Sequence, residues 1–224
     1  MPRLPRAVFA GVPHYITQRG NRRDDVFFSD DDRGAYLEWL HSYCEKHEVD
    51  ILAYCLMRNH IHLVAVPNSE DGLQRALKPL HMRYAQRVNR LQGWKGHLWQ
   101  GRFFSSPLDD AYLWAAIRYV ERNPICVGLA ERAEDYRWSS AAAYCGLRSD
   151  VALSNKAEWR QKLSSIEDWS SWLSVEEESA KLDTLRQHSE KGLPCGSDDF
   201  VQALGKKIGR ILEKRPQGRP KREA

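Results

Sequence analysis

The alternation of apolar and polar residues in the first half of the chain predicts short strands joined to amphipathic helices. Residues 8–18, 51–57 and 60–66 follow strand patterns bounded by turn residues, and only Arg58 and Asn59 separate the last two strands. Such a tight connection predicts an antiparallel hairpin. The aromatic segment 96–108 predicts a further strand or hairpin.

Three stretches place apolar residues at helical spacing. The first begins at a capping residue near Ser29, and the second carries an apolar stripe that ends at Leu91, with a kink expected at Pro79. The third starts near Asp109 and is expected to end at residues 123–124. The order of elements predicts an α+β fold, a small antiparallel sheet with helices packed on it.

The character of the chain changes after about residue 145. Several tryptophans in a polar setting predict short helices packed against the main domain, and residues 197–212 predict one more amphipathic helix. The last twelve residues are rich in Pro, Gly, Lys and Arg, which is typical of a segment that is disordered when free. We therefore divide the chain into a main domain (1–145), a C-terminal helical extension (146–212) and a basic tail (213–224).

The amino-acid composition indicates the compartment in which the protein is expected to work. Hydrophobic residues make up 42% and charged residues 29% of the 224 residues, as in ordinary globular proteins. No apolar run is long enough for a membrane span or a signal peptide, so we expect a cytoplasmic protein without membrane contact. The five cysteines are scattered and form no C-x-x-C pair, which favours buried, reduced thiols.

Positive charge is concentrated in two islands. Residues 205–224 and residues 71–104 each carry a net charge of +6, which leaves −8 on the rest of a chain whose total is +4. Clustered cations of this kind bind phosphate backbones, although either island alone is also consistent with a solvated helix face or a free tail.

The predicted second strand of the hairpin contains His60 and His62, whose side chains point the same way because strands alternate. Such a pair is either a metal chelate or two polar residues on a wet sheet face. Tyr119 and Asn123, at helical spacing i and i+4, offer a phenol and an amide oxygen on one helix face. Two imidazoles, an amide oxygen and open positions suit Mg²⁺ or Mn²⁺ better than structural zinc.

The chain contains seven blocks in a fixed order: "HYITQRGNRR", "YCLMRNHIHLVAVP", "GHLWQGRFFSSPL", "YVERNPICVGLA", "WSSAAAY", "LPCGSDDFVQALGKKIGRIL" and "RPQGRPK". Together these blocks resemble the REP-associated tyrosine transposases, a branch of the single-tyrosine HUH transposases. The resemblance implies a ferredoxin-like HUH fold in which His60, His62 and Asn123 bind the metal and Tyr119 is the nucleophile. It further implies cleavage and rejoining of single-stranded, hairpin-forming repeats through a 5′-phosphotyrosine. Two residues depart from the family pattern. Arg58 stands at a position where the family usually has proline, and the Asn123 side chain is shorter than the glutamine that insertion-sequence relatives have at this position.

Candidate DNA contacts follow from the basic residues. We expect phosphate or groove contacts from a set of eight: Arg19, Arg22, Arg83, Arg87, Arg90, Arg102, Arg219 and Lys221. Trp94, Trp99, Phe103 and Phe104 are candidates for base stacking, with at least half of them in the core and Trp99 and Phe103 on opposite faces.

Two other functions remain open from the sequence. A non-catalytic protein that binds hairpin DNA would keep the fold without the covalent step, and an HUH replication initiator or relaxase is a second, less well matched enzyme class. The C-terminal extension favours a monomer over the helix-exchanging dimer of insertion-sequence relatives.

Overall fold

The structure is a computed structural model that describes residues 7–176 and 178–212. Its elements are, in chain order, β1 (His14–Arg19), η1 (Asn21–Arg23), α1 (Asp30–Lys46), β2 (Val49–Leu56), β3 (His60–Pro67), α2 (Gly72–Gln92), β4 (Phe104–Pro107), α3 (Asp110–Cys126), η2 (Ala133–Asp135), α4 (Ala141–Tyr144), α5 (Ala157–Leu163), α6 (Trp169–Ser174), α7 (Ser179–Lys191) and α8 (Asp198–Ile208).

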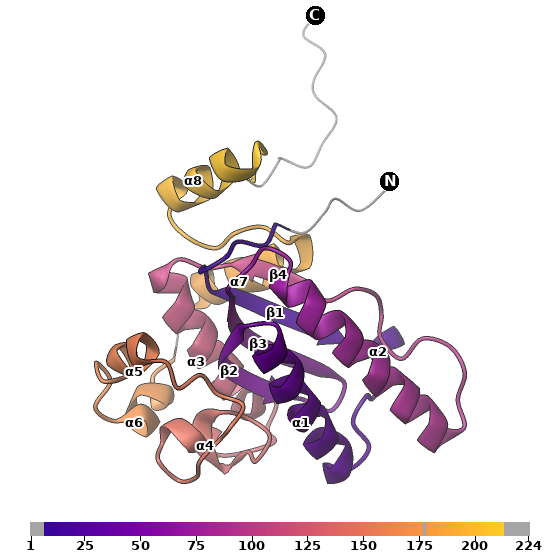
Figure 1. Ribbon diagram of the computed structural model, residues 1–224. Coiled ribbons are helices and arrows are strands. Elements are labelled where there is room, and N and C mark those ends of the chain that lie inside the picture. The colour runs from indigo at the N-terminus through magenta and orange to yellow at the C-terminus, as the bar shows by residue number, and fades with distance from the viewer. Residues whose placement is uncertain (1–6, 177, 213–224) are drawn as a thin grey trace, which may run out of the picture.

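The four strands form one antiparallel sheet in the order β2-β3-β1-β4. Helices α1 and α2 cover one face of the sheet, and α3 covers the other, with α7 packed beside α3 and β4 (Figure 1). This arrangement confirms the predicted α+β fold and the β2–β3 hairpin. The division of the chain into 1–145, 146–212 and 213–224 stays a prediction.

Each face of the sheet has its own apolar core. Ile16, Ile61 and Leu63 point toward α1 and α2, whereas Tyr15 and Val64 point toward α3. Alternation along β1 and β3 produces this division, because neighbouring side chains of a strand lie on opposite faces. The even-numbered histidines of β3 therefore lie on the α3 side.

The first strand is shorter than residues 8–18, because Gly11 has a positive φ of 72° and the pyrrolidine ring of Pro13 leaves no N–H for the ladder. Ala7 and Phe9 pack instead against Leu204 and Leu212, near the C-terminal helix α8. The N-terminal segment and the C-terminal helix thus form a third small core beside the sheet (Figure 1).

Two helix details differ from the sequence prediction. Leu91 is 59% exposed, so the apolar stripe of α2 ends at Val88. The helix is continuous from Gly72 to Gln92 with Pro79 inside it, and the kink at Pro79 stays a prediction. Helix α3 continues past Pro124 to Cys126, because a proline in the last turn removes only one helical hydrogen bond.

The described cysteines form no disulfide, as predicted, although Cys126 is exposed. Among the described residues no helix combines the length and apolar character that crossing a membrane requires.

Candidate active site

His60 and His62 lie side by side on β3, on the face covered by α3. Their imidazole rings are 4.6 Å apart, centre to centre, and nearly perpendicular at 87°. Between them, Ile61 points into the α1–α2 core and is completely buried. The strand therefore positions the two rings as a pair, as the sequence predicts.

Hydrogen bonds of the Asn59 side chain determine which nitrogen of His60 carries its lone pair. Asn59 Nδ2 donates to the carbonyl oxygen of Arg23 (2.9 Å), which places Asn59 Oδ1 2.6 Å from His60 Nδ1. Because an amide oxygen only accepts, His60 Nδ1 donates and the lone pair lies on Nε2. Metal-binding histidines commonly donate their second nitrogen in this way.

His62 is 4% exposed, and its two nitrogens have different surroundings. Nδ1 is hydrogen-bonded to Tyr15 Oη on the neighbouring strand β1, at 2.7 Å, whereas Nε2 is buried and has no hydrogen-bond partner among the described residues. Binding of a cation at Nε2 requires the tautomer in which Nδ1 donates to Tyr15 Oη, because the lone pair then lies on Nε2. A buried ring nitrogen without a partner is destabilising unless a ligand engages it.

Burial lowers the pKa of both imidazoles. The pKa of His60 falls to about 4, with the nearby Arg19 guanidinium lowering it further. Burial also holds the pKa of His62 well below its usual value, with added contributions from His60 and Arg19. Both rings are therefore neutral at pH 7 and can coordinate a cation without first releasing a proton.

Helix α3 brings a phenol against this pair. Asp109 caps the helix by accepting a hydrogen bond from the backbone N–H of Tyr112 (2.9 Å). The ring of Tyr119 meets His62 edge to face, with centres 5.6 Å apart and an angle of 76°. The structure thus brings together Tyr119, His60 and His62, which the sequence had singled out from separate segments.

Asn123 lies one turn beyond Tyr119 on α3 and is 7% exposed. Within the described residues no hydrogen bond joins it to either histidine or to Tyr119. One helical turn is a rise of about 5.4 Å, so its backbone lies about one turn along α3 from that of Tyr119. Its role as a metal ligand stays a prediction.

The two imidazoles fit a divalent cation. The buried, unpartnered Nε2 of His62 and the oriented Nε2 of His60 are two nitrogen donors on one face of β3. No group of three or more His, Cys, Asp or Glu side chains suited to a metal occurs in the described part of the chain. Further ligands would therefore have to be oxygens of another kind, such as an amide, water or phosphate, which are ligands that Mg²⁺ and Mn²⁺ prefer.

Sequence reasoning missed Arg186, which α7 places at the nucleophile candidate. Its Nε donates to Tyr119 Oη at 3.5 Å, and its guanidinium carbon lies 5.3 Å from the centre of the phenol ring. Nothing in the sequence around Arg186 marks it as a site residue, because only the packing of α7 on α3 brings it to Tyr119. Tyr15 and Asn59, which orient the histidines, were missed for the same reason.

The eight candidate DNA contacts differ in their surroundings. Arg19 borders the histidine pair, and Arg22 is exposed in the short η1 turn that follows β1. On α2, Arg83 lies 4.0 Å from the centre of a Trp39 ring, and Arg87 pairs with Asp32 at 3.5 Å. Both guanidinium groups thus already interact with side chains of α1.

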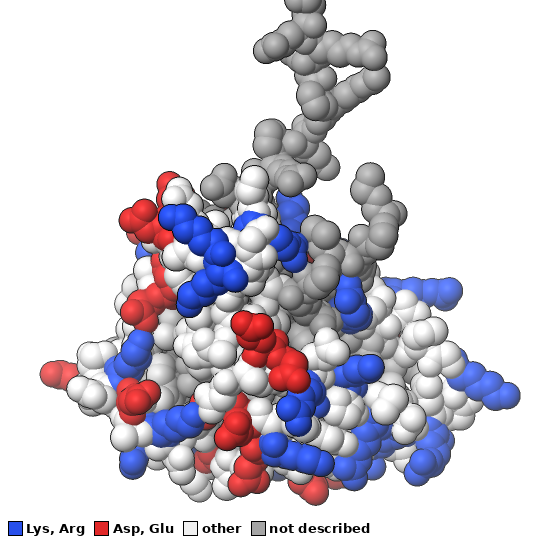
Figure 2. Space-filling view, turned by 45° about the horizontal axis from the view of Figure 1, so that its top comes forward, with Lys and Arg blue, Asp and Glu red and all other residues white. Residues whose placement is uncertain are grey.

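Arg90 and Arg102 are exposed and form no ion pair with any described residue. Helix α2 as a whole carries five Lys or Arg residues and no acid. At the right of Figure 2, separate basic side chains stand among uncharged ones, and no acidic side chain is visible there. Arg219 and Lys221 lie outside the described residues.

The predicted positions of the aromatic residues in segment 94–104 were partly wrong. Trp99 and Phe103 are both buried, as expected for half of the four, but both contact the ring of His81 and therefore lie on the same face. Trp94 is 48% exposed and packs its edge against Phe28.

Comparisons with known proteins agree with this geometry. The model of the family "Transposase IS200 like" matches residues 8–123, about half of the chain. A Haemophilus influenzae (strain Rd) protein named "Putative REP-associated tyrosine transposase" is 26% identical over 108 residues, which are 43% of this chain and 61% of the relative. The chain thus matches about three fifths of that relative's length.

A solved structure of a REP-associated tyrosine transposase bound to a REP hairpin has a similar fold. It aligns with a TM-score of 0.53 at 18% identity and covers 70% of this chain and 93% of that chain.

The chain belongs to the IS200-like transposase family, since the family model covers the sheet, both histidines and the helix with Tyr119. Within that family, the curated relative and the solved structure confirm the resemblance to REP-associated tyrosine transposases that the sequence blocks indicate.

Proposed function

We propose that this protein is a metal-dependent transposase that cleaves and rejoins single-stranded DNA at hairpin-forming repeats. The observation that carries the proposal is the contact of the Tyr119 phenol with His62, whose Nε2 is buried and unpartnered. The candidate nucleophile thereby contacts one neutral imidazole, which in turn lies beside the second. Membership of a transposase family and the hairpin in the similar solved structure support DNA as the substrate.

The chemistry follows from the needs of phosphodiester cleavage. A divalent cation held by the Nε2 atoms of His60 and His62, with Asn123 as a further candidate ligand, would neutralise charge on the scissile phosphate. Tyr119 Oη attacks phosphorus, the bond from phosphorus to the 3′ oxygen breaks, and the 3′ oxygen takes up a proton from solvent and leaves as a hydroxyl. The phenolic proton passes to solvent, and the DNA 5′ phosphate remains linked to Tyr119.

Rejoining is the reverse of this step. A 3′-hydroxyl attacks the phosphotyrosine, the bond from phosphorus to Tyr119 Oη breaks, and the phenol recovers its proton. Because one phosphoester replaces another in each direction, the reaction needs no nucleotide cofactor. Arg186, at 3.5 Å from Tyr119 Oη, would stabilise the negative charge on this oxygen during both attack and departure.

The test is covalent labelling of the protein by DNA. A panel of hairpin oligonucleotides with unpaired flanks of random sequence is incubated with the protein in Mg²⁺ or Mn²⁺ and analysed on denaturing gels. We expect a protein–DNA adduct that is lost in Tyr119→Phe, in His62→Ala and in EDTA. If the parent binds the hairpins but forms no adduct in either metal, the function is binding alone.

A further inference from the structure

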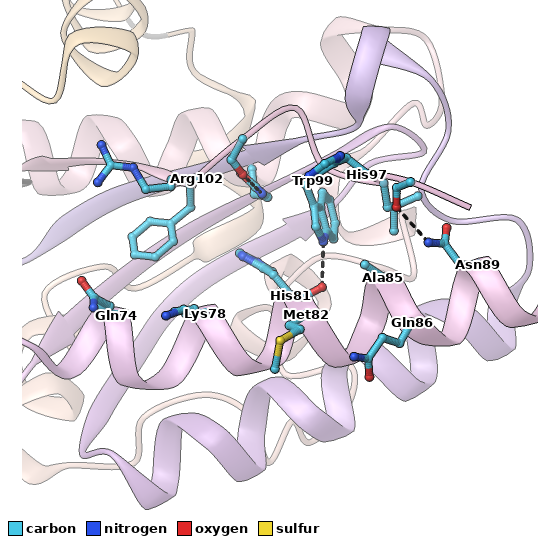
Figure 3. A pocket seen from close by; sticks show the side chains of 15 residues that line it. Gln74, Lys78, His81, Met82, Ala85, Gln86, Asn89, His97, Trp99 and Arg102 are labelled. Carbon is cyan, nitrogen blue, oxygen red and sulfur yellow. Dashed lines mark hydrogen bonds between the residues drawn. The ribbon is translucent and has the colours of Figure 1, made fainter. Parts of the chain in front are cut away.

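A preformed pocket lies between α2 and the segment 96–103, which leads into β4 (Figure 3). Its volume is about 610 Å³, within the range of small-molecule sites. Its surface is mostly apolar, and its lining includes Met82, Trp99 and Phe103 together with Gln18 of β1. We refer to it as the α2–β4 pocket.

Three hydrogen bonds fix the walls of this pocket. Trp99 Nε1 donates to the carbonyl oxygen of His81 at 3.0 Å, and Asn89 Nδ2 donates to that of Gly96 at 3.0 Å. Gln18 Nε2 donates to the carbonyl oxygen of Gly101, also at 3.0 Å. The first two bonds join α2 to the opposite wall, as the dashed lines in Figure 3 show. The pocket is therefore ready to accept a ligand without rearrangement.

The charge of the lining favours an anionic ligand with an apolar body. Among the described residues no Asp or Glu lines the pocket, whereas Lys78 and Arg102 both do, and neither forms an ion pair within this part of the chain. The amide side chains of Gln74 and Gln86 are exposed at the same pocket. Cations, free amides and an apolar floor together match a nucleotide, whose phosphate, base edge and base face require these three partners.

The pocket borders the end of the strand that adjoins the histidine pair. Gln18 lines the pocket, while the next residue, Arg19, lies on the other face and influences both histidines. The outer wall is attached at this point, because Gln100 N–H donates to the carbonyl oxygen of Arg19 (2.9 Å) and Trp99 pairs with Gly20. The pocket thus lies at the end of β1 that carries Arg19, on the opposite face of the sheet from the histidines.

The separation suits a short piece of single strand. Layers packed on a sheet are about 10 Å apart, and a stacked strand rises about 3.4 Å per nucleotide. The histidines and the pocket lie on opposite faces of the sheet, so their layers are about 20 Å apart. About six nucleotides therefore suffice to pass from the histidine face around the end of β1 to the α2–β4 pocket.

We propose that the α2–β4 pocket binds an unpaired nucleotide that flanks the scissile phosphate. The position on the substrate rests on the function proposed above, whereas nucleotide binding by the pocket can be tested without cleavage. The base would lie against Met82 and the edges of Trp99 and Phe103, with its phosphate near Lys78 or Arg102.

The experiment compares two labelled hairpins by fluorescence anisotropy in EDTA, one with a short unpaired flank of random sequence and one without a flank. Met82→Glu introduces a carboxylate into the pocket. Leu91→Glu is the matched control, because it adds the same charge on the same helix, and the two residues are 58% and 59% exposed. Both variants should fold, since neither side chain is part of the core.

We expect the parent and Leu91→Glu to bind the flanked hairpin about tenfold more tightly than the hairpin without a flank, as one held base permits. Met82→Glu should lose most of this preference and bind the hairpin without a flank as Leu91→Glu does. A flank of abasic sugars should also lose the preference in the parent.

Three results would overturn the proposal. They are a preserved flank preference in Met82→Glu, an abasic flank that binds as tightly as a normal one, and no flank preference in the parent. Because no metal is present, these results are independent of whether the protein forms the covalent adduct, so the pocket and the catalytic proposal can fail separately.

Discussion

Glu121 lies between Tyr119 and Asn123 in the α3 sequence and is completely buried. Its Oε1 accepts a hydrogen bond from Ser140 Oγ, and its Oε2 accepts one from Trp169 Nε1 at 2.7 Å. Burial raises the pKa of this carboxyl from 4.5 to about 7, although both hydrogen bonds act in the opposite direction. The helix that carries the nucleophile candidate is therefore linked to the C-terminal extension through an ionisable group.

The raised pKa makes stability depend on pH in a defined direction. The folded protein holds the proton of Glu121 more tightly than the unfolded chain, so this group favours folding below pH 4.5 and loses that contribution as the pH rises to about 7. At about 1.36 kcal/mol per pKa unit, the shift corresponds to roughly 3 kcal/mol in the free energy of unfolding.

Glu121→Gln tests this magnitude, because glutamine resembles the protonated carboxyl. Its Oε1 can accept from Trp169, and its Nε2 can donate to Ser140 Oγ. We expect the stability of the variant relative to the parent to increase by about 2–3 kcal/mol between pH 5 and pH 8, measured by urea unfolding. Glu38→Gln, at an exposed position of α1, is the control. Parallel pH profiles for the parent and Glu121→Gln would refute the reasoning.

Three further predictions concern the site itself. Tyr15→Phe removes the partner of His62 Nδ1, so the affinity for Mn²⁺, measured by calorimetry, should fall about tenfold or more; an unchanged affinity would show that Tyr15 does not orient the ring. Asn59→Ala should weaken Mn²⁺ binding similarly by freeing His60 to rotate, and a normal affinity would contradict the tautomer assigned to His60. Arg186→Ala should slow adduct formation about tenfold while Arg186→Lys retains most of the rate, as expected for one charged contact to the phenolic oxygen; equal rates in the parent and Arg186→Ala would exclude this role.

Local patterns were sufficient for most of the main domain. The alternation in β3 predicted that His60 and His62 share a face, and the spacing of Tyr119 and Asn123 predicted one helix face for them. These predictions depend only on neighbours in the sequence. For the same reason the sequence located the β2–β3 hairpin and the start of α1 at Ser29.

Contacts between distant segments could not be read from the sequence. Arg186 reaches Tyr119 from a helix 67 residues further along the chain, and Tyr15 reaches His62 from 47 residues before it. The exposure of Leu91 likewise follows from where α2 passes beyond the core, not from its own periodicity. Helical and strand periodicity indicate which side chains share a face, whereas tertiary packing decides what each face meets.

The chemical identity of the residue joined to DNA is the most direct test of the role proposed for Tyr119. The protein is incubated with Mn²⁺ and the hairpin panel, digested with nuclease and protease, and analysed by tandem mass spectrometry for a nucleotide-modified peptide. We predict a 5′-phosphate-linked nucleotide on Tyr119, so that a label 3′ of the cleavage point stays with the protein. Modification of another residue, or a 3′-phosphate link, would contradict the proposed mechanism.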